Sequence, residues 1–304
     1  MKKKVRYLFL VVIFFAFAQV AMAQQLPQIT NYVINDFVLN PALSGTNEDF
    51  EVKSDNRYQW VGITDAPRTY VLSVNGPYQS KNMGYGGYIY NDVTGPTSRT
   101  GFALSYGYHV QLTETLKLSM GLSAGMEQFA VDGTQITVHD PGDPVLTNGY
   151  QSVIVPDFGF GAQIYTDKYW LGLSIPQLYE ARLKFFDYET STLSNLATHF
   201  YLTGGYKYEL NENIRLEPSF LLQYVAPVPP QLDITIRAIY KKMLWAGLGV
   251  RFGDAITAMI GYTFKDYLMF AYSYDLPIST ISSYTTGTHE IMFGLRFKNK
   301  PKKG

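Results

Sequence analysis

The last strand-like segment of the 304-residue chain reads THEIMFGLRF, residues 288–297, and the fold prediction depends on it. In an extended strand, Ile291, Phe293, Leu295 and Phe297 share one face, and Glu290, Met292, Gly294 and Arg296 share the other. One face can therefore contact lipid while the other lines a polar lumen. We expect Phe293, Leu295 and Phe297 to form the apolar signal that outer-membrane barrels present to their insertion machinery. The last strand of a soluble β-sandwich would alternate in the same way, so the other segments must distinguish the two folds.

The composition excludes several classes of function. The 25 basic residues are balanced by 25 acidic residues, whereas a nucleic-acid-binding protein needs a basic surface to neutralise phosphates. Cysteine is absent, so disulfides, thiol catalysis and thiolate metal sites are excluded. The many tyrosine, phenylalanine and glycine residues, 25, 19 and 26, favour β-structure.

The N-terminus has the three parts of a secretory signal peptide. A basic start is followed by an apolar run and by Ala21-Met22-Ala23, which predicts a signal peptide over residues 1–23 with cleavage after Ala23. A retained anchor helix is the alternative, but the apolar run is short for one. Residues 24–48 follow no regular period and are expected to form either a periplasmic arm or a plug inside the lumen. The pattern favours the plug.

Strict alternation of apolar with polar or small residues then recurs up to residue 297. The segments at residues 102–111 and 116–127 are the clearest cases, and the inward face of residues 51–59 would carry Glu51, Lys53, Asp55 and Arg57. We count about 14 such segments, an even number as in bacterial single-chain barrels. The sequence therefore predicts an all-β transmembrane outer-membrane barrel over residues 49–297, followed by a basic tail at residues 298–304.

The connections support the barrel. Every second connection counted back from the terminal strand is short, whereas the longest, at residues 129–156 and 177–196, lie between them. Outer-membrane barrels combine short periplasmic turns with longer extracellular loops in this way. A soluble β-sandwich does not require its short and long connections to alternate in this way.

No constellation of residues predicts catalysis, a cofactor or a metal. The histidines His109, His139, His199 and His289 lie on separate segments, and their spacing suits no zinc site. Inward carboxylates such as Glu127, Glu217 and Asp233 are expected to pair with Lys117, Arg215, Arg237 and Arg251, because charges facing a confined lumen need partners. Such a network would fill the lumen and oppose free diffusion. An outer-membrane enzyme that uses Glu217, Asp233 and His199 is a further alternative.

A set of short motifs runs in a fixed order along most of the mature chain. Its members are Asn40-Pro41-Ala42 with Gly45, Trp60, Pro67, Asp143-Pro144, Pro218, Trp245, Tyr274-Asp275 and His289-Glu290. In their order and spacing they resemble the PorP/SprF family of outer-membrane proteins from the type IX secretion and gliding systems of Bacteroidetes. Thr288 stands where the closing motif of the family is expected to have Ser, a change that keeps the hydroxyl.

The resemblance implies a role without enzymatic activity. Family members support secretion or surface attachment of large adhesin-like proteins that carry a type IX sorting domain, or they join the periplasmic secretion and motility components. We therefore expect outer-membrane lipid and proteins of these kinds as partners, with contacts at the long loops and at the N-terminal segment. The alternative is an outer-membrane porin, or a transporter for hydrophobic substrates with an N-terminal hatch.

Overall fold

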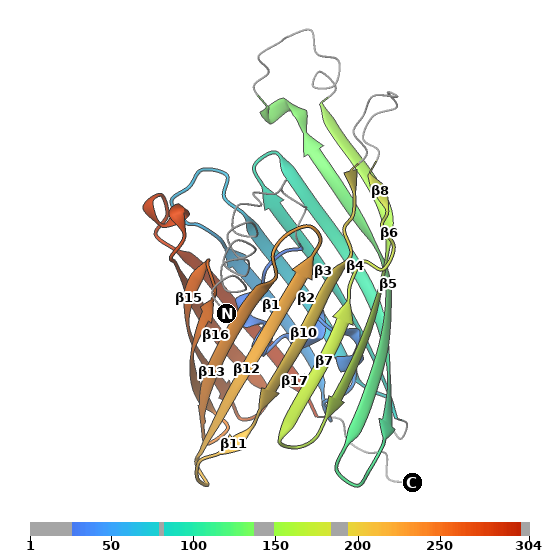
Figure 1. Ribbon diagram of the computed structural model, residues 1–304, viewed down its shortest axis with the longest axis vertical. Helices are drawn as coiled ribbons and strands as arrows, with labels where there is room; N and C mark the ends of the chain where they lie inside the picture. The colour runs from blue at the N-terminus through green and yellow to red at the C-terminus, as the bar shows by residue number, and fades with distance from the viewer. Residues whose placement is uncertain (1–25, 79–81, 137–148, 184–193, 299–304) are drawn as a thin grey trace, which may run out of the picture.

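The computed structural model describes residues 26–78, 82–136, 149–183 and 194–298. In these residues the chain forms a closed antiparallel barrel of fourteen strands, β1 to β7, β10 and β12 to β17, around an N-terminal segment (Figure 1). Strand β1 pairs with β17, and β10 pairs with β12, so the sheet closes on itself. The predicted transmembrane β-barrel of about fourteen strands is confirmed. The predicted signal peptide and basic tail fall outside the described residues, apart from Lys298.

The barrel strands are β1 (Phe50–Tyr58), β2 (Arg68–Pro77), β3 (Met83–Thr94), β4 (Thr97–Gln111), β5 (Lys117–Asp132), β6 (Tyr150–Tyr165), β7 (Tyr169–Ile175), β10 (His199–Tyr206), β12 (Ile214–Val225), β13 (Gln231–Tyr240), β14 (Leu244–Arg251), β15 (Ala255–Phe264), β16 (Leu268–Pro277) and β17 (Thr288–Phe297). Shorter pieces are β8 (Arg182–Leu183), β9 (Ser194–Asn195) and β11 (Tyr208–Glu209). The 3₁₀ turns are η1 (Thr30–Val33), η2 (Asp36–Val38), η3 (Pro41–Leu43), η4 (Gly133–Gln135) and η5 (Thr280–Ser283). None of the helices in the described ranges has the length and apolar character that crossing a membrane requires.

The period-2 pattern of each strand sorts its side chains between lipid and lumen. On β17, Phe293, Leu295 and Phe297 point outward and are 52%, 42% and 54% exposed, whereas Glu290 and Met292 point inward and are buried. A barrel is the fold that satisfies every backbone hydrogen bond inside a membrane with strands alone. The protein is an integral outer-membrane protein with an apolar outer face and a polar interior.

The two ends of the barrel differ in their connections. One end, here called the turn end, carries tight turns at residues 166–168, 241–243 and 265–267. The other, the loop end, carries the connections at residues 133–149, 176–198 and 278–287. Because outer-membrane barrels place short turns in the periplasm, we expect the turn end to face the periplasm and the loop end to face outward.

The loop after β5 is shorter than the sequence predicted, because the strands continue into it. Strand β5 runs to Asp132 and β6 begins at Tyr150, so the predicted loop at residues 129–156 shrinks to residues 133–149. The inward residues of this extension, Phe129 and Val155, pack with Ala181, Leu183 and Leu196 of the next connection. This small apolar core explains why the paired strands rise beyond the others at the loop end, as Figure 1 shows.

Candidate functional site

Residues 26–46, here called the luminal segment, lie inside the barrel and fill its interior with three 3₁₀ turns (Figure 1). Asn40 caps η3, because its side-chain oxygen accepts the N–H of Ala42 at 3.0 Å. Pro41 follows at the first position, where its fixed φ suits a helical turn. Phe37 and Ala42 are 2% and 0% exposed. The motif Asn40-Pro41-Ala42 therefore shapes a turn that packs against the inner wall.

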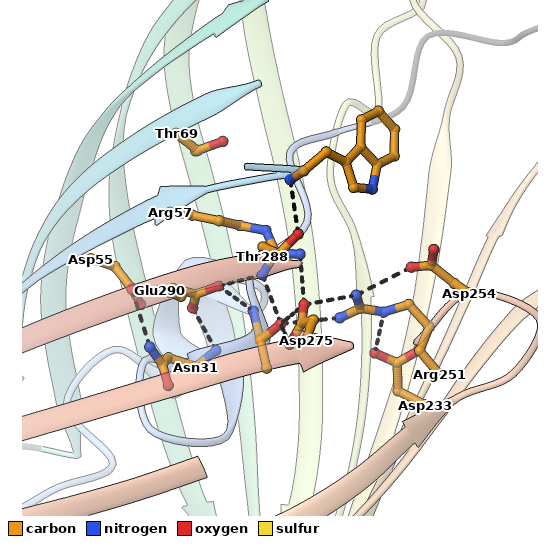
Figure 2. Close-up of polar contacts among 12 residues, drawn as sticks. Asn31, Asp55, Arg57, Thr69, Asp233, Arg251, Asp254, Asp275, Thr288 and Glu290 are labelled. Atoms are coloured by element: carbon orange, nitrogen blue, oxygen red, sulfur yellow. Dashed lines mark hydrogen bonds and ion pairs between the residues drawn. The ribbon is translucent and has the colours of Figure 1, made fainter. Parts of the chain in front are cut away.

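The carboxylate of Glu290 holds the first turn of this segment. Its two oxygens accept the backbone N–H groups of Thr30 at 2.8 Å and Asn31 at 2.6 Å, as Figure 2 shows. The guanidinium of Arg57 contacts the same carboxylate at 2.7 Å and reaches Asp275 at 2.8 Å. Charge-assisted bonds of this kind are shorter and stronger than neutral ones.

The guanidinium of Arg251 extends this network of charges to further strands of the barrel wall. Arg251 lies 3.0 Å from Asp233 and 3.4 Å from Asp275, and it donates to the hydroxyl of Thr30 at 3.3 Å. That hydroxyl also donates to Asp275 at 2.8 Å. We call Thr30, Arg57, Asp233, Arg251, Asp275 and Glu290 the Arg57 cluster. Five barrel strands, β1, β13, β14, β16 and β17, thus converge on one turn of the luminal segment.

Every member of the Arg57 cluster is at most 5% exposed. Removing a charge from water costs several kcal/mol, so each member depends on its partners. Three carboxylates face two guanidinium groups, and the backbone N–H groups of Thr30 and Asn31 help to compensate the remaining negative charge. The cluster therefore ties the folding of the luminal segment to that of the barrel.

Further hydrogen bonds follow the luminal segment toward the turn end. Each joins a side chain of the barrel wall to the segment: Lys53 to the carbonyl of Ile34 at 2.6 Å, Ser73 to the side chain of Asn35 at 2.9 Å, Ser174 to the carbonyl of Leu39 at 2.6 Å, Ser119 to the carbonyl of Ala42, and His109 to the carbonyl of Ser44 at 3.0 Å. These anchors come from β1, β2, β7, β5 and β4. The segment is held along its whole length.

Two glycines on the wall allow the backbone of the segment to approach closely. A Cβ at Gly121 would lie 2.3 Å from the carbonyl carbon of Pro41, and one at Gly84 would lie 2.2 Å from the carbonyl oxygen of Ser44. Both obstacles are backbone atoms, which cannot rotate away. At these positions only glycine lets the luminal segment reach the wall.

We expect Gly121→Val to displace η3 and to destabilise the protein by about 1–3 kcal/mol, the usual cost of overpacking an interior. Urea unfolding followed by tryptophan fluorescence measures this loss. Ser123→Val is the matched control on the same strand. Ser123 also faces inward, but among the described residues it makes no hydrogen bond to the luminal segment. Equal unfolding midpoints for the two variants would show that the close approach at Gly121 is not required.

The interior charges pair largely as expected. Glu217 binds Arg215 at 2.9 Å and Arg237 at 2.6 Å, and Asp233 binds Arg251. The partner of Glu127 is not among the four basic residues that the sequence predicted. Arg99 contacts Glu127 at 2.7 Å, whereas Lys117 lies exposed at the start of β5, with its ammonium 6.0 Å from the ring centroid of Tyr165. Because Arg99 and Glu127 both face inward from neighbouring strands, the register of β4 and β5 brings them together.

The remaining motif residues stabilise the loop end. Trp60 donates its backbone N–H to the hydroxyl of Thr288 at 3.1 Å, a bond that serine would also make. The hydroxyl of Tyr274 donates to the carbonyl of Thr286 at 2.6 Å, and the ring of His289 contacts the hydroxyl of Tyr272 at 2.7 Å. These contacts join β16 and β17 to the adjoining loop.

Four further motif positions lie elsewhere in the structure. The carbonyl of Pro67 accepts the N–H of Gln59 at 2.9 Å. Trp245 lies in the lumen beneath Arg237, with 5.5 Å between the guanidinium carbon and the ring centroid, and Pro218 faces outward on β12. Gly45 has a φ of +73°, which glycine adopts at little cost. Asp143 and Pro144 lie outside the described residues.

Residues 26–46 also contribute partners that the sequence pattern did not identify. Thr30 and Asn31 meet Glu290 across about 260 positions of the chain, and no local signal marks them. Burial raises the pKa of the neighbouring Tyr32 phenol to about 12, so Tyr32 is neutral at physiological pH.

The arrangement does not resemble a catalytic or metal centre. Across the described parts of the chain, no group of three His, Asp or Glu side chains is placed to hold a metal ion. The three residues considered for catalysis are engaged elsewhere: Glu217 and Asp233 in ion pairs, and His199 as acceptor of the N–H of Leu26 at 3.3 Å.

The comparisons with known proteins identify a family. The sequence profile described as "Type IX secretion system membrane protein PorP/SprF" matches residues 21–295, which is most of the chain. No curated protein matches the chain in sequence.

Several solved outer-membrane proteins are similar in structure. A monoaromatic hydrocarbon channel, CymD, is 12% identical with a TM-score of 0.47, and the match covers 91% of this chain and 94% of that one. Omp33 of Acinetobacter baumannii is 10% identical with a TM-score of 0.48, covering 84% and 100%. The toluene transporter TodX of P. putida is 10% identical with a TM-score of 0.46, covering 86% and 93%. Likeness at this level transfers no substrate or mechanism.

Proposed function

Since the chain belongs to the PorP/SprF family of type IX secretion system membrane proteins, we propose that it acts without enzymatic activity, by binding a protein partner at the ends of its barrel. The observation that carries this proposal is the luminal segment, which occupies the interior and is hydrogen-bonded to β1, β2, β4, β5, β7, β16 and β17. Because the interior is filled, we propose that partners bind at the two ends of the barrel.

Small cavities support a closed lumen. Two cavities of about 50 and 40 Å³ lie between the luminal segment and the wall, and a hollow of about 260 Å³ lies at the turn end, where the segment ends. One water needs roughly 10–15 Å³ of such a cavity, so these spaces hold a few waters or one small group and do not form a continuous path through the barrel. On this proposal the protein is neither a general porin nor a transporter whose N-terminal hatch stands open.

The loop end offers an ordered surface for a partner. The loops at residues 59–67 and 278–287 are joined by backbone bonds of 2.8 Å in both directions between Val61 and residues 286 and 287. We call these two loops the loop platform. Tyr284 on it is 74% exposed and Val61 is 39% exposed. Exposed apolar side chains on a fixed scaffold are a common feature of protein interaction sites.

The partner we propose at the loop end is a secreted adhesin-like surface protein or its sorting domain. At the turn end we propose the periplasmic type IX secretion and motility components. Deleting the gene in the native host should leave the adhesin unsecreted or release it into the medium. Normal surface display and motility in the deletion strain would contradict the proposal.

We expect Tyr284→Ser to lower the amount of adhesin retained on the cell surface severalfold, because hot-spot tyrosines contribute on the order of 2 kcal/mol to an interface. Immunoblots of cell and medium fractions from a complemented deletion strain measure the change. Tyr208→Ser is the control, since Tyr208 is similarly exposed but lies at the turn end. Equal retention with both variants would remove the loop platform as the contact surface.

A further inference from the structure

One of the two interior cavities has walls of a distinct chemical kind. The cavity of about 50 Å³ lies between the luminal segment and the strands β2, β3, β5, β6 and β10. Its lining includes apolar residues such as Leu26 and Ile29 and three tyrosines, Tyr88, Tyr90 and Tyr201. Two carboxylates, Glu127 and Asp157, also line it. The cavity is thus aromatic and acidic at once.

The two carboxylates differ in how they are satisfied. Glu127 accepts the hydroxyl of Tyr90 at 2.6 Å, the guanidinium of Arg99 at 2.7 Å and the side-chain amide of Gln177 at 3.0 Å. Arg99 is therefore committed to Glu127. Asp157 is 7% exposed, and its Oδ1 atom has no hydrogen-bond partner among the described residues. No ion pair between described residues includes Asp157, although Arg99 attracts it through space and the backbone N–H groups of Phe158 and Gln177 face it.

The surrounding groups compensate the charge of Asp157 only in part, because Arg99 is already bonded to Glu127. The nearest histidine of the wall, His199, accepts the N–H of Leu26 through Nε2 and lies 2.9 Å from the carbonyl of Ala197 through Nδ1. A ring with one accepting nitrogen is neutral. Burying a carboxylate that lacks an ion-pair partner is costly, so the site favours a positively charged hydrogen-bond donor.

Size and shape narrow the choice of cation. A primary ammonium group is close to a water molecule in size. The cavity, at about 50 Å³, accommodates the ammonium group together with the methylene group attached to it. The faces of aromatic rings attract such a cation, and the neighbouring apolar side chains suit an alkyl stem. Pro176 and Gln177, which begin the connection after β7, border the cavity on the loop-end side.

We propose that this cavity binds a primary alkylammonium group, with the Asp157 carboxylate as counter-charge and Tyr88, Tyr90 and Tyr201 as its walls. The group arrives from the loop end, carried either by a free amine or by a lysine side chain of a polypeptide. The site is separate from the Arg57 cluster, and it does not depend on the partner proposed for the loop platform.

The test uses the full mature chain in detergent micelles and ligand-observed saturation-transfer NMR. The probes are n-propylammonium chloride, 1-propanol as its neutral counterpart, and the peptide N-acetyl-Gly-Lys-Gly-amide as a lysine source. We expect saturable binding of propylammonium and none of propanol at the same concentrations. Binding of the peptide as well assigns the site to a polypeptide lysine, whereas binding of propylammonium alone assigns it to a free amine.

Two variants and one control decide whether Asp157 provides the site. Asp157→Asn keeps the shape of the side chain and should weaken propylammonium binding by about tenfold or more, because it removes the counter-charge. Tyr201→Leu should weaken it by about fivefold through loss of the ring face. Asp132→Asn removes an exposed carboxylate at the end of β5 and should leave binding unchanged. Equal binding of propanol, or unaltered binding in Asp157→Asn, would overturn the proposal.

Discussion

Arg57→Met should destabilise the barrel by about 3–5 kcal/mol, the largest loss we expect from a single substitution. Methionine keeps the length and the apolar stem of the side chain, so the change removes mainly charge and hydrogen bonds. Glu290 and Asp275 then lose a guanidinium that lies 2.7 and 2.8 Å away, while both remain at most 2% exposed. Among the described residues, Glu290 is then left without an ion partner and Asp275 keeps only Arg251 at 3.4 Å, which is the source of the cost. Urea unfolding in detergent measures it.

The ion pair of Arg215 provides the control for Arg57→Met. The Arg215 side chain is 27% exposed and pairs with Glu217, which retains Arg237 when Arg215 is replaced. Arg215→Met should therefore cost about 1 kcal/mol or less. The double variant Arg57→Met with Glu290→Gln should be less destabilised than the sum of the single changes, because one unpaired charge is removed. A loss below about 1 kcal/mol for Arg57→Met would show that the cluster does not stabilise the fold.

Removing residues 27–44 should make the outer membrane permeable to large polar solutes. A barrel of fourteen strands lies between the eight-stranded barrels that side chains fill and the sixteen-stranded barrels that enclose an aqueous channel, so without the segment its interior becomes a pore. We expect the uptake of a bulky polar antibiotic such as vancomycin to rise on the order of tenfold. Growth inhibition of the native host measures the uptake.

The comparison strain for this deletion expresses Tyr284→Ser, which alters the loop end but leaves the luminal segment in place. It should remain as resistant as the unaltered strain. The amount of folded barrel in each strain is checked by its heat-dependent shift in gel mobility. Unchanged resistance in a strain that carries normal amounts of the deleted barrel would mean that another part of the chain closes the lumen.

The barrel could be predicted from the sequence because alternation is a local property. In residues 288–297, Ile291, Phe293, Leu295 and Phe297 recur at every second residue, and the structure places this set on the outer face, opposite the inward Met292. The same alternation predicts which charged residues face inward. It correctly places Glu51, Lys53, Asp55 and Arg57 in the lumen. A period of two fixes the face of a residue without any knowledge of its neighbours.

Partners across the lumen could not be predicted in the same way. Which charges meet depends on register. Glu127 binds Arg99, which was not among the expected bases, because Arg99 faces inward from the adjoining strand close to Glu127. The bonds from Glu290 to Thr30 and Asn31 join the two ends of the chain. Residues 26–46 follow no period, and their place in the interior depends on backbone contacts at positions such as Gly84 and Gly121.

Single-channel recording of the unaltered protein in planar bilayers tests the central claim most directly, because it asks whether the luminal segment closes the barrel. After insertion of the purified mature chain at high salt, the account predicts a flat baseline, with steps appearing only for the chain that lacks residues 27–44. Stable, uniform open-channel steps from the unaltered protein would contradict it, and would favour a porin or transporter over a protein that works through contacts at its ends.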